Sequence, residues 1–75
     1  MYPNSATTKL LRRLSKKEKG TYFTNVARWA KTLKCTYSEA RTAFKFAVDN
    51  GYLEVKSNAQ GAEKIFVRTA RAVNL

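Results

Sequence analysis

Histidine is absent from this 75-residue sequence, and cysteine, proline and glycine are scarce, with one, one and three copies. Because Cys35 is the only thiol, the chain lacks the ligands of a zinc finger and cannot form an intrachain disulfide. Histidine-based catalysis is excluded as well. The five carboxylates are scattered and form no recognisable acid–base pair. We therefore expect no enzyme, no catalytic residue, no metal and no cofactor.

Long apolar runs are also missing. No stretch approaches the roughly 20 apolar residues of a membrane-spanning helix, and the basic residues near the start follow the small polar ones, unlike a signal peptide. We expect no membrane partner and a cytoplasmic location, at the nucleoid of the cell or of a host cell. The hydrophobic fraction of 44% is ordinary for a globular chain. It favours one domain over 1–75, with a core in about 6–68 and a short tail in 69–75.

Acidic residues are few beside the basic ones. Fifteen lysines and arginines face five aspartates and glutamates, which gives a formal net charge of +10. Such a charge on a small chain attracts polyanions. A purely solubilising charge usually raises both signs together, which is not the pattern here. Nucleic acid is therefore the favoured partner, ahead of anionic membrane surfaces and acidic proteins.

Three segments place apolar residues at helical spacing. They cover residues 5–17, 25–34 and 36–50. Asn4 or Ser5 can cap the first helix, and Thr24 is the expected cap of the second. The third helix has the strongest start signal, because Thr36 and Glu39 match a capping box in which each side chain binds the other's backbone amide.

The apolar pattern also predicts how these elements pack. Trp29 lies in the apolar stripe of the second helix, so we expect it in the core rather than stacked on bases. Phe46 points away from the apolar face of the third helix and receives no role. The β-prone runs 52–56 and 62–69 are separated by a short Asn- and Gly-containing loop, which predicts a hairpin. The run "TYF" at 21–23 is too short for more than one or two ladder hydrogen bonds. The expected inward residues of the hairpin are Leu53, Val55, Ile65 and Val67.

The order helix, short strand, helix, turn, helix and hairpin resembles the winged helix-turn-helix family of DNA-binding domains over about residues 6–68. The residues that carry the resemblance are Trp29, Ala30, Leu33, Thr36, Ala40, Phe44, Ala47, Gly51, Tyr52 and Leu53. Lys34 departs from the pattern, because the family often has glycine in this turn. Lys34 must therefore adopt a positive φ, or the turn must be longer.

The resemblance implies an α+β fold of three helices with a C-terminal β-hairpin wing. It also implies binding to double-stranded DNA, with the third helix in the major groove and the wing on the flanking backbone. Small phage, plasmid and microbial regulators are similar in size and organisation. We expect a monomer in isolation, since nothing resembles a heptad or a dimerisation helix, and pairing on DNA stays open.

The third helix is electrically balanced, with Arg41 and Lys45 against Glu39 and Asp49. Base edges in the major groove are read by hydrogen bonds and methyl contacts, whereas phosphates are bound by charge. A helix that reads bases can therefore be neutral while its neighbours carry the cations. The expected base-reading residues are Ser38, Arg41, Thr42 and Lys45. The expected phosphate contacts are Arg28, Lys31, Lys34, Lys56, Lys64 and Arg68.

Several alternatives stay open at this stage. The balanced charge can be a coincidence, Arg41 can lie over the edge of the core, and the lysines of the hairpin can protect a solvated sheet edge. The net charge also suits an RNA- or ribosome-associated protein. Such proteins commonly stack bases on exposed aromatic residues of a sheet. Here only Phe66 is expected to face outward, which weakens this alternative. A protein-interaction module on the same scaffold would use Phe46 and the C-terminal "AVNL".

Overall fold

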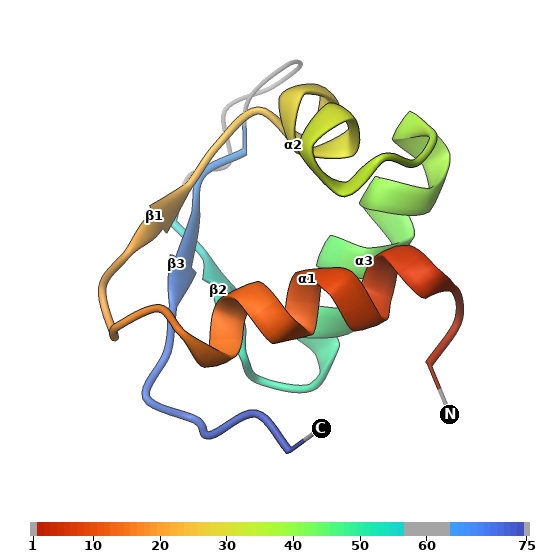
Figure 1. The fold of residues 1–75 in the computed structure, drawn as a ribbon. Helices are drawn as coiled ribbons and strands as arrows, with labels where there is room; N and C mark the ends of the chain where they lie inside the picture. Colours follow the sequence, from red (N-terminus) through yellow and green to blue (C-terminus); the bar gives the residue numbers. More distant parts are fainter. Residues whose placement is uncertain (1, 57–63, 75) are drawn as a thin grey trace.

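The described part of the chain in the computed structural model, residues 2–56 and 64–74, forms three α-helices and a three-stranded antiparallel sheet (Figure 1). The sheet lies on one side of the molecule and the helices on the other. The elements are α1 (Ser5–Ser15), β1 (Tyr22–Phe23), α2 (Val26–Leu33), α3 (Tyr37–Asp49), β2 (Leu53–Val55) and β3 (Phe66–Arg68). The expected α+β class and the three helices are confirmed.

Side-chain caps set the starts of the helices. Asn4 caps α1 by accepting from the amide of Thr7 at 2.9 Å. At α3 the predicted capping box is complete: the Thr36 hydroxyl accepts from the Glu39 amide at 3.1 Å, and the Glu39 carboxylate accepts from the Thr36 amide at 2.9 Å. The predicted N-cap of α2, Thr24, is wrong by one residue. Asn25 is the cap, because asparagine tolerates its positive φ of 61° and accepts from the Arg28 amide.

The turn between α2 and α3 is short, and Lys34 adopts the left-handed conformation, with φ 56° and ψ 53°. The amide of Cys35 donates to the carbonyl of Ala30 at 3.0 Å, and that of Lys34 to Lys31 at 3.2 Å. This pair of bonds closes the helix as a Schellman motif does. Of the two expected alternatives, positive φ is therefore the one adopted.

The sheet has one strand more than the expected hairpin. The strand order is β1-β3-β2, so β3 is central and antiparallel to both neighbours. The short run Tyr22–Phe23 pairs with β3 as β1, and two further bonds between the Gly20–Thr21 backbone and Arg68 extend this pairing. A β-prone dipeptide is thus stabilised by the otherwise open edge of a neighbouring strand.

The expected inward set of the sheet is wrong in part. Leu53 is buried as predicted, but Phe66, expected outward, lies in the core opposite Phe23. Val67 is buried as predicted, at 8% exposure, but it points to the other face of β3 than Phe66 and lies outside the main core cluster. Ile65 is half-buried. Val55 pairs with Phe66 at the sheet edge and is 38% exposed.

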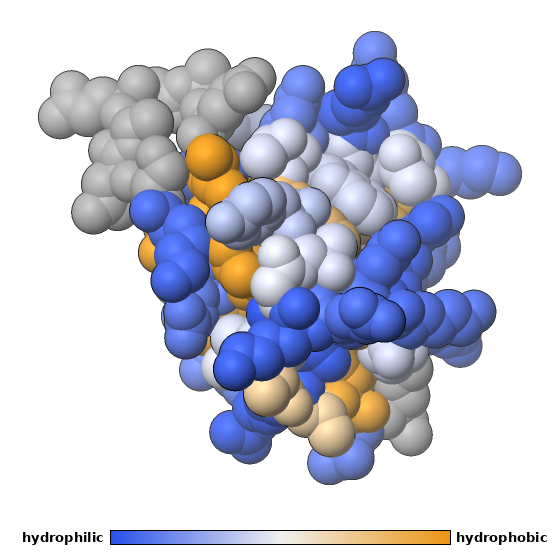
Figure 2. Space-filling view, turned by 90° about the vertical axis from the view of Figure 1, so that its left-hand side faces the viewer, coloured by the Kyte–Doolittle hydropathy of each residue, from blue (hydrophilic) through white to orange (hydrophobic). Residues whose placement is uncertain are grey.

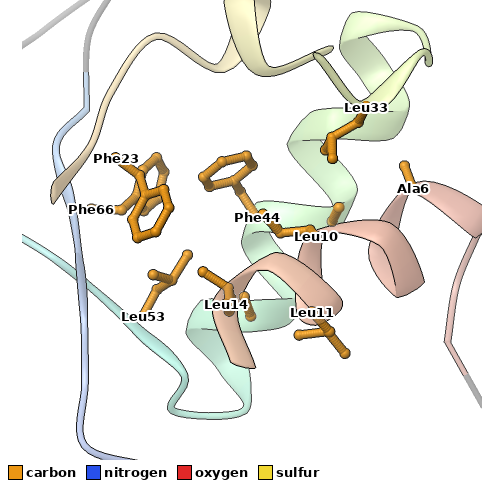
Figure 3. Close-up of a cluster of buried hydrophobic side chains, with 11 residues drawn as sticks. Ala6, Leu10, Leu11, Leu14, Phe23, Leu33, Phe44, Leu53 and Phe66 are labelled. Carbon is orange, nitrogen blue, oxygen red and sulfur yellow. The ribbon is translucent and has the colours of Figure 1, made fainter. Parts of the chain in front are cut away.

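The core joins the two layers (Figure 3). Phe44 of α3 lies 4.9 Å from Phe66 between ring centroids, and Trp29 contacts both Phe23 and Phe44 at its margin. The core role predicted for Trp29 is therefore confirmed, although the ring is only half-buried. The remaining large side chains of the core come mainly from α1 and are Leu10, Leu11 and Leu14. Burying each leucine contributes about 1.5–3 kcal/mol.

Phe46, to which no role was assigned from the sequence, packs against the N-terminal segment. Its ring meets that of Tyr2 edge to face at 5.5 Å between centroids. The Tyr2 hydroxyl donates to the backbone carbonyl of Asn74 at 3.0 Å, so both ends of the described chain meet beside α3. This contact covers Phe46 and makes it half-buried.

Candidate functional site

The exposed side of α3 carries all four residues expected to read bases. The opposite side of the helix packs in the core through Ala40, Ala43, Phe44 and Ala47. At 3.6 residues per turn, the remaining positions project away from the core. The exposed polar residues of α3 are the four expected base readers, Ser38, Arg41, Thr42 and Lys45, together with Asp49 at the end of the helix.

These four residues line one wall of a groove of about 730 Å³. Val26 and Ala27, at the start of α2, line a second side, and Val55 with Lys64 lines the side next to the sheet. Helix α3 and the β2–β3 region therefore share one concave surface. Lys64, an expected phosphate contact, therefore lies in the same groove as the four expected base readers.

Local contacts orient the polar side chains of this groove. The Arg41 guanidinium lies over the Tyr37 ring, 5.8 Å from its centroid. The Thr42 hydroxyl donates to the backbone carbonyl of Ser38 at 3.1 Å. Lys45 lies 3.7 Å from the Asp49 carboxylate, but both side chains are exposed, so this ion pair is weak. None of these contacts occupies all the donors of Arg41 or Lys45, which remain available to a ligand.

Tyr37 shares helical spacing with the apolar face of α3 but is 53% exposed in the groove. It is the first residue of α3 and lies at the border of the apolar stripe, where the core no longer covers it. Its contact with Arg41 makes it a functional candidate that the sequence pattern missed. The spacing of four residues between the two side chains was the available signal.

The expected phosphate contacts fall into three groups. Arg28, Lys31 and Lys34 are exposed on α2 and its C-cap, outside the groove. Lys56 is exposed beside β2, 3.9 Å from the Glu54 carboxylate. Lys64 alone of the expected phosphate contacts lines the groove. The remaining part of the hairpin turn lies outside the described residues.

The prediction that Arg68 contacts phosphate is wrong. Its side chain is only 5% exposed and cannot reach a phosphate from this position. Its Nε donates to the carbonyl of Leu14 at 2.8 Å, at the end of α1. Its Nη1 lies within hydrogen-bond distance of three further carbonyls, those of Tyr52, Thr69 and Arg71. Arg68 therefore connects β3 to α1 and to the segment after β3.

The outer face of the sheet exposes Tyr22, which is 70% accessible. Figure 2 shows this side of the molecule, with hydrophilic side chains at the margins and paler and apolar side chains between them. The aromatic that faces outward is thus Tyr22 rather than the expected Phe66, which is in the core.

Two ionisable side chains near the α2–α3 turn have shifted pKa values. Hydrogen bonds from the amide and hydroxyl of Thr36 lower the pKa of Glu39, which stabilises its ionised, capping form. Burial, followed by the negative charge of Glu39, raises the pKa of the Cys35 thiol. The thiol is therefore protonated at neutral pH and is a poor nucleophile.

Within residues 2–56 and 64–74, no three His, Cys, Asp or Glu side chains gather closely enough to hold a metal ion. No helix of the same residues is long and apolar enough to cross a membrane. Comparisons with protein families, curated proteins and solved structures find no match for this chain.

Proposed function

We propose that this chain is a sequence-reading double-stranded DNA-binding protein with a winged helix-turn-helix fold, acting as a small transcriptional regulator. The observation that carries the proposal is the exposed side of α3, which presents two hydroxyl and two cationic side chains. A 13-residue helix is about 20 Å long and 10–12 Å wide, and a B-DNA major groove is about 12 Å wide. In this proposal α3 enters that groove.

The charges around α3 support the same arrangement. Lys45 has Asp49 as a neighbour and Arg41 lies over Tyr37, so the helix itself adds little net charge. The cations of α2 and its cap, and Lys64 beside the sheet, form no ion pair with a described carboxylate. Those of α2 and its cap are Arg28, Lys31 and Lys34. A duplex on α3 would meet Lys64 along one edge of the groove, where the β2–β3 region would act as the wing. Phosphate binding would then position the duplex, and hydrogen bonds from α3 would select its sequence.

Selection of bound duplexes from a random pool tests this proposal, followed by titration of variants against the selected site and a scrambled duplex. Arg41→Ala should weaken binding to the selected site by about 1–3 kcal/mol and relax the preference at one base position. Lys31→Ala is the matched loss of one exposed cation. It should weaken both duplexes about equally and reduce the salt slope by about one. If Arg41→Ala also weakens both duplexes equally, α3 does not read the sequence.

Tyr22 favours a second candidate function, binding of single-stranded RNA. An exposed aromatic ring on a sheet is a common platform for base stacking, and Tyr22 is 70% exposed. Stacking on one ring contributes about 1–3 kcal/mol per base. Under this alternative, Tyr22→Ala would reduce affinity for single-stranded RNA by that amount and leave duplex binding unchanged. A stronger effect of Arg41→Ala on duplex DNA, with no effect of Tyr22→Ala on RNA, would reject it.

A further inference from the structure

A second groove, separate from the one beside α3, lies between the C-terminal half of α1 and the end of α2. It has a volume of about 420 Å³. Five of its seven lining residues are cationic: Lys9, Arg12, Arg13, Lys16 and Lys17. All five are exposed, and the proposed recognition by α3 uses none of them. We call this surface the α1 groove.

Helical geometry gathers these charges. Lys9, Arg13 and Lys16 follow one another at spacings of four and three residues, which places them on one side of α1. Their backbone positions span about 10 Å at a rise of 1.5 Å per residue. Phosphates of one DNA strand advance about 3.4 Å each along the duplex axis. Along the duplex axis, the stripe therefore spans about three phosphate steps of one strand.

The cations of the α1 groove are available to a ligand. In the described part of the chain, the ion pairs involve only Lys45 and Lys56, which lie elsewhere. Two of the five side chains are already positioned: the Lys9 ammonium donates to the carbonyl of Leu33 at 3.2 Å, and the Arg13 guanidinium lies 5.9 Å from the Trp29 ring centroid. The guanidinium and ammonium groups of Arg12, Lys16 and Lys17 have no such role.

Favourable interaction with the end of α1 does not explain five cations. A helix C-terminus stabilises cations in its last turn, where only Arg12 and Arg13 lie. Lys9 lies a turn earlier, and like charges three and four residues apart repel one another. An external polyanion would remove that repulsion.

The α1 groove and the groove beside α3 share no lining residue and border opposite ends of α2: Thr32 and Leu33 line the first, and Val26 and Ala27 line the second. Helices α1 and α3 pack on each other through their buried sides, and Figure 3 shows the leucines of α1 directed toward the core. The outward sides therefore point away from each other. Two packed helices with axes 8–10 Å apart and diameters of 10–12 Å separate these surfaces by about 20 Å. At that separation, we expect a straight duplex seated on α3 not to reach the α1 groove.

We propose that the α1 groove binds the phosphate backbone of a second DNA duplex, so that one protein molecule bridges two duplexes. The inference rests on the proposed function, because it takes α3 as the site of the first duplex. Recognition by the α1 groove would be independent of sequence, since it presents charge and few other donors.

A bridging assay tests this. A biotinylated duplex with the selected site is immobilised, saturated with protein and incubated with a fluorescent duplex that lacks the site. Wild-type protein should retain the fluorescent duplex. Arg12→Gln/Lys16→Gln should reduce retention by about tenfold while changing affinity for the selected site by less than about twofold. The charge-matched control, Lys19→Gln/Arg71→Gln, changes exposed cations outside both grooves and should keep retention within about twofold.

The outcomes are separable. If wild-type protein binds no single duplex, the proposed function fails first. If it binds the selected site without retaining a second duplex, only the bridging proposal fails. If Arg12→Gln/Lys16→Gln retains the second duplex as well as the wild type does, the α1 groove does not hold it. The two duplexes would then be joined by two protein molecules that bind each other. Parallel losses of site affinity and retention would make the α1 groove part of the first interface. Selective displacement of the fluorescent duplex by RNA, with equal DNA much less effective, would reject DNA as the partner. Thermal melting of each variant confirms that it folds.

Discussion

Replacing Arg68 by methionine tests whether this residue holds the fold together or contacts DNA. The guanidinium is buried at 5% exposure and donates to carbonyls of three segments, among them Leu14 at 2.8 Å and Arg71 at 2.8 Å. A hydrogen bond from a charged donor contributes about 1.5–3 kcal/mol. Methionine keeps most of the apolar stem but removes every donor. Arg71 is exposed, so water can replace the hydrogen bond to its carbonyl in the variant. The net loss is therefore smaller than the sum of the lost bonds, and we expect the free energy of unfolding to fall by about 2–4 kcal/mol.

That loss is large for a chain of this size, because 75 residues at 0.05–0.15 kcal/mol each give a total stability of about 4–11 kcal/mol. Equilibrium unfolding in urea, followed by the fluorescence of Trp29, measures the change from the midpoint and slope. Arg71→Met is the matched control, because Arg71 is an exposed arginine three residues away. It should change stability by about 0.5 kcal/mol or less.

The two possible roles of Arg68 differ in their effect on DNA binding. If Arg68 is structural, folded Arg68→Met protein should bind DNA with an unchanged salt slope. If it contacts a phosphate, the slope should fall by about one unit. A loss of stability below about 1 kcal/mol together with that lower slope would refute the structural role.

The other predictions concern the turn, the capping box and the whole interface. Lys34→Gly should raise the free energy of unfolding, measured in urea, by about 0.5–1 kcal/mol, because glycine adopts φ 56° without a Cβ clash. Lys34→Ala keeps the Cβ and should not raise the free energy of unfolding. Folding lowers the pKa of Glu39 below its ordinary value of 4.5. The ionised carboxylate therefore stabilises the fold above pH 4.5, and this stabilisation is lost as the pH falls through the lowered pKa. Glu39→Gln should therefore flatten this part of the pH dependence measured by urea unfolding, and an unchanged profile would contradict the capping role. Wild-type binding to duplex DNA should show a log–log salt slope of about −4 to −6 for five to seven phosphate contacts, and a flat salt titration would remove the electrostatic part of the proposal.

The helical part of the fold was predictable because its signals are local. The capping box depends on Thr36 and Glu39, three residues apart, and a pattern of this kind needs no knowledge of the rest of the chain. The apolar side of α3 follows from the same periodicity and places Ser38, Arg41, Thr42 and Lys45 on the opposite side. The cap of α2 was displaced by one residue because Thr24 and Asn25 both suit the position, and only the backbone angle of Asn25 decides between them.

The sheet was less predictable because strand faces depend on pairing between distant residues. The run Ile65–Val67 is apolar throughout, so alternation cannot show which residues point inward. The faces of β3 were assigned one residue out of step, whereas those of β2 were assigned correctly, as Leu53 shows. That single shift accounts for two errors, since Phe66 and Arg68 have the same parity and both lie on the buried side. Pairing with β1, 43 or more residues away, settles the parity in the structure.

The alanines of α3 connect the core to both proposed DNA-binding surfaces. Ala40, Ala43 and Ala47 are fully buried, and their small side chains let α1 approach α3 closely. Apart from Phe44 of α3 and Leu33 of α2, the large core side chains then come from α1 and the sheet, so neither α1 nor α3 has to bury its polar side. As a result α3 keeps its four expected base readers and Asp49 exposed, and α1 keeps its basic stripe exposed, in two grooves that share no lining residue. A larger residue such as leucine at Ala43 would force α1 outward, at a cost of about 1–3 kcal/mol for overpacking. The close packing of the two helices thus determines the separation of the two surfaces, and with it the distance at which two bound duplexes would be held.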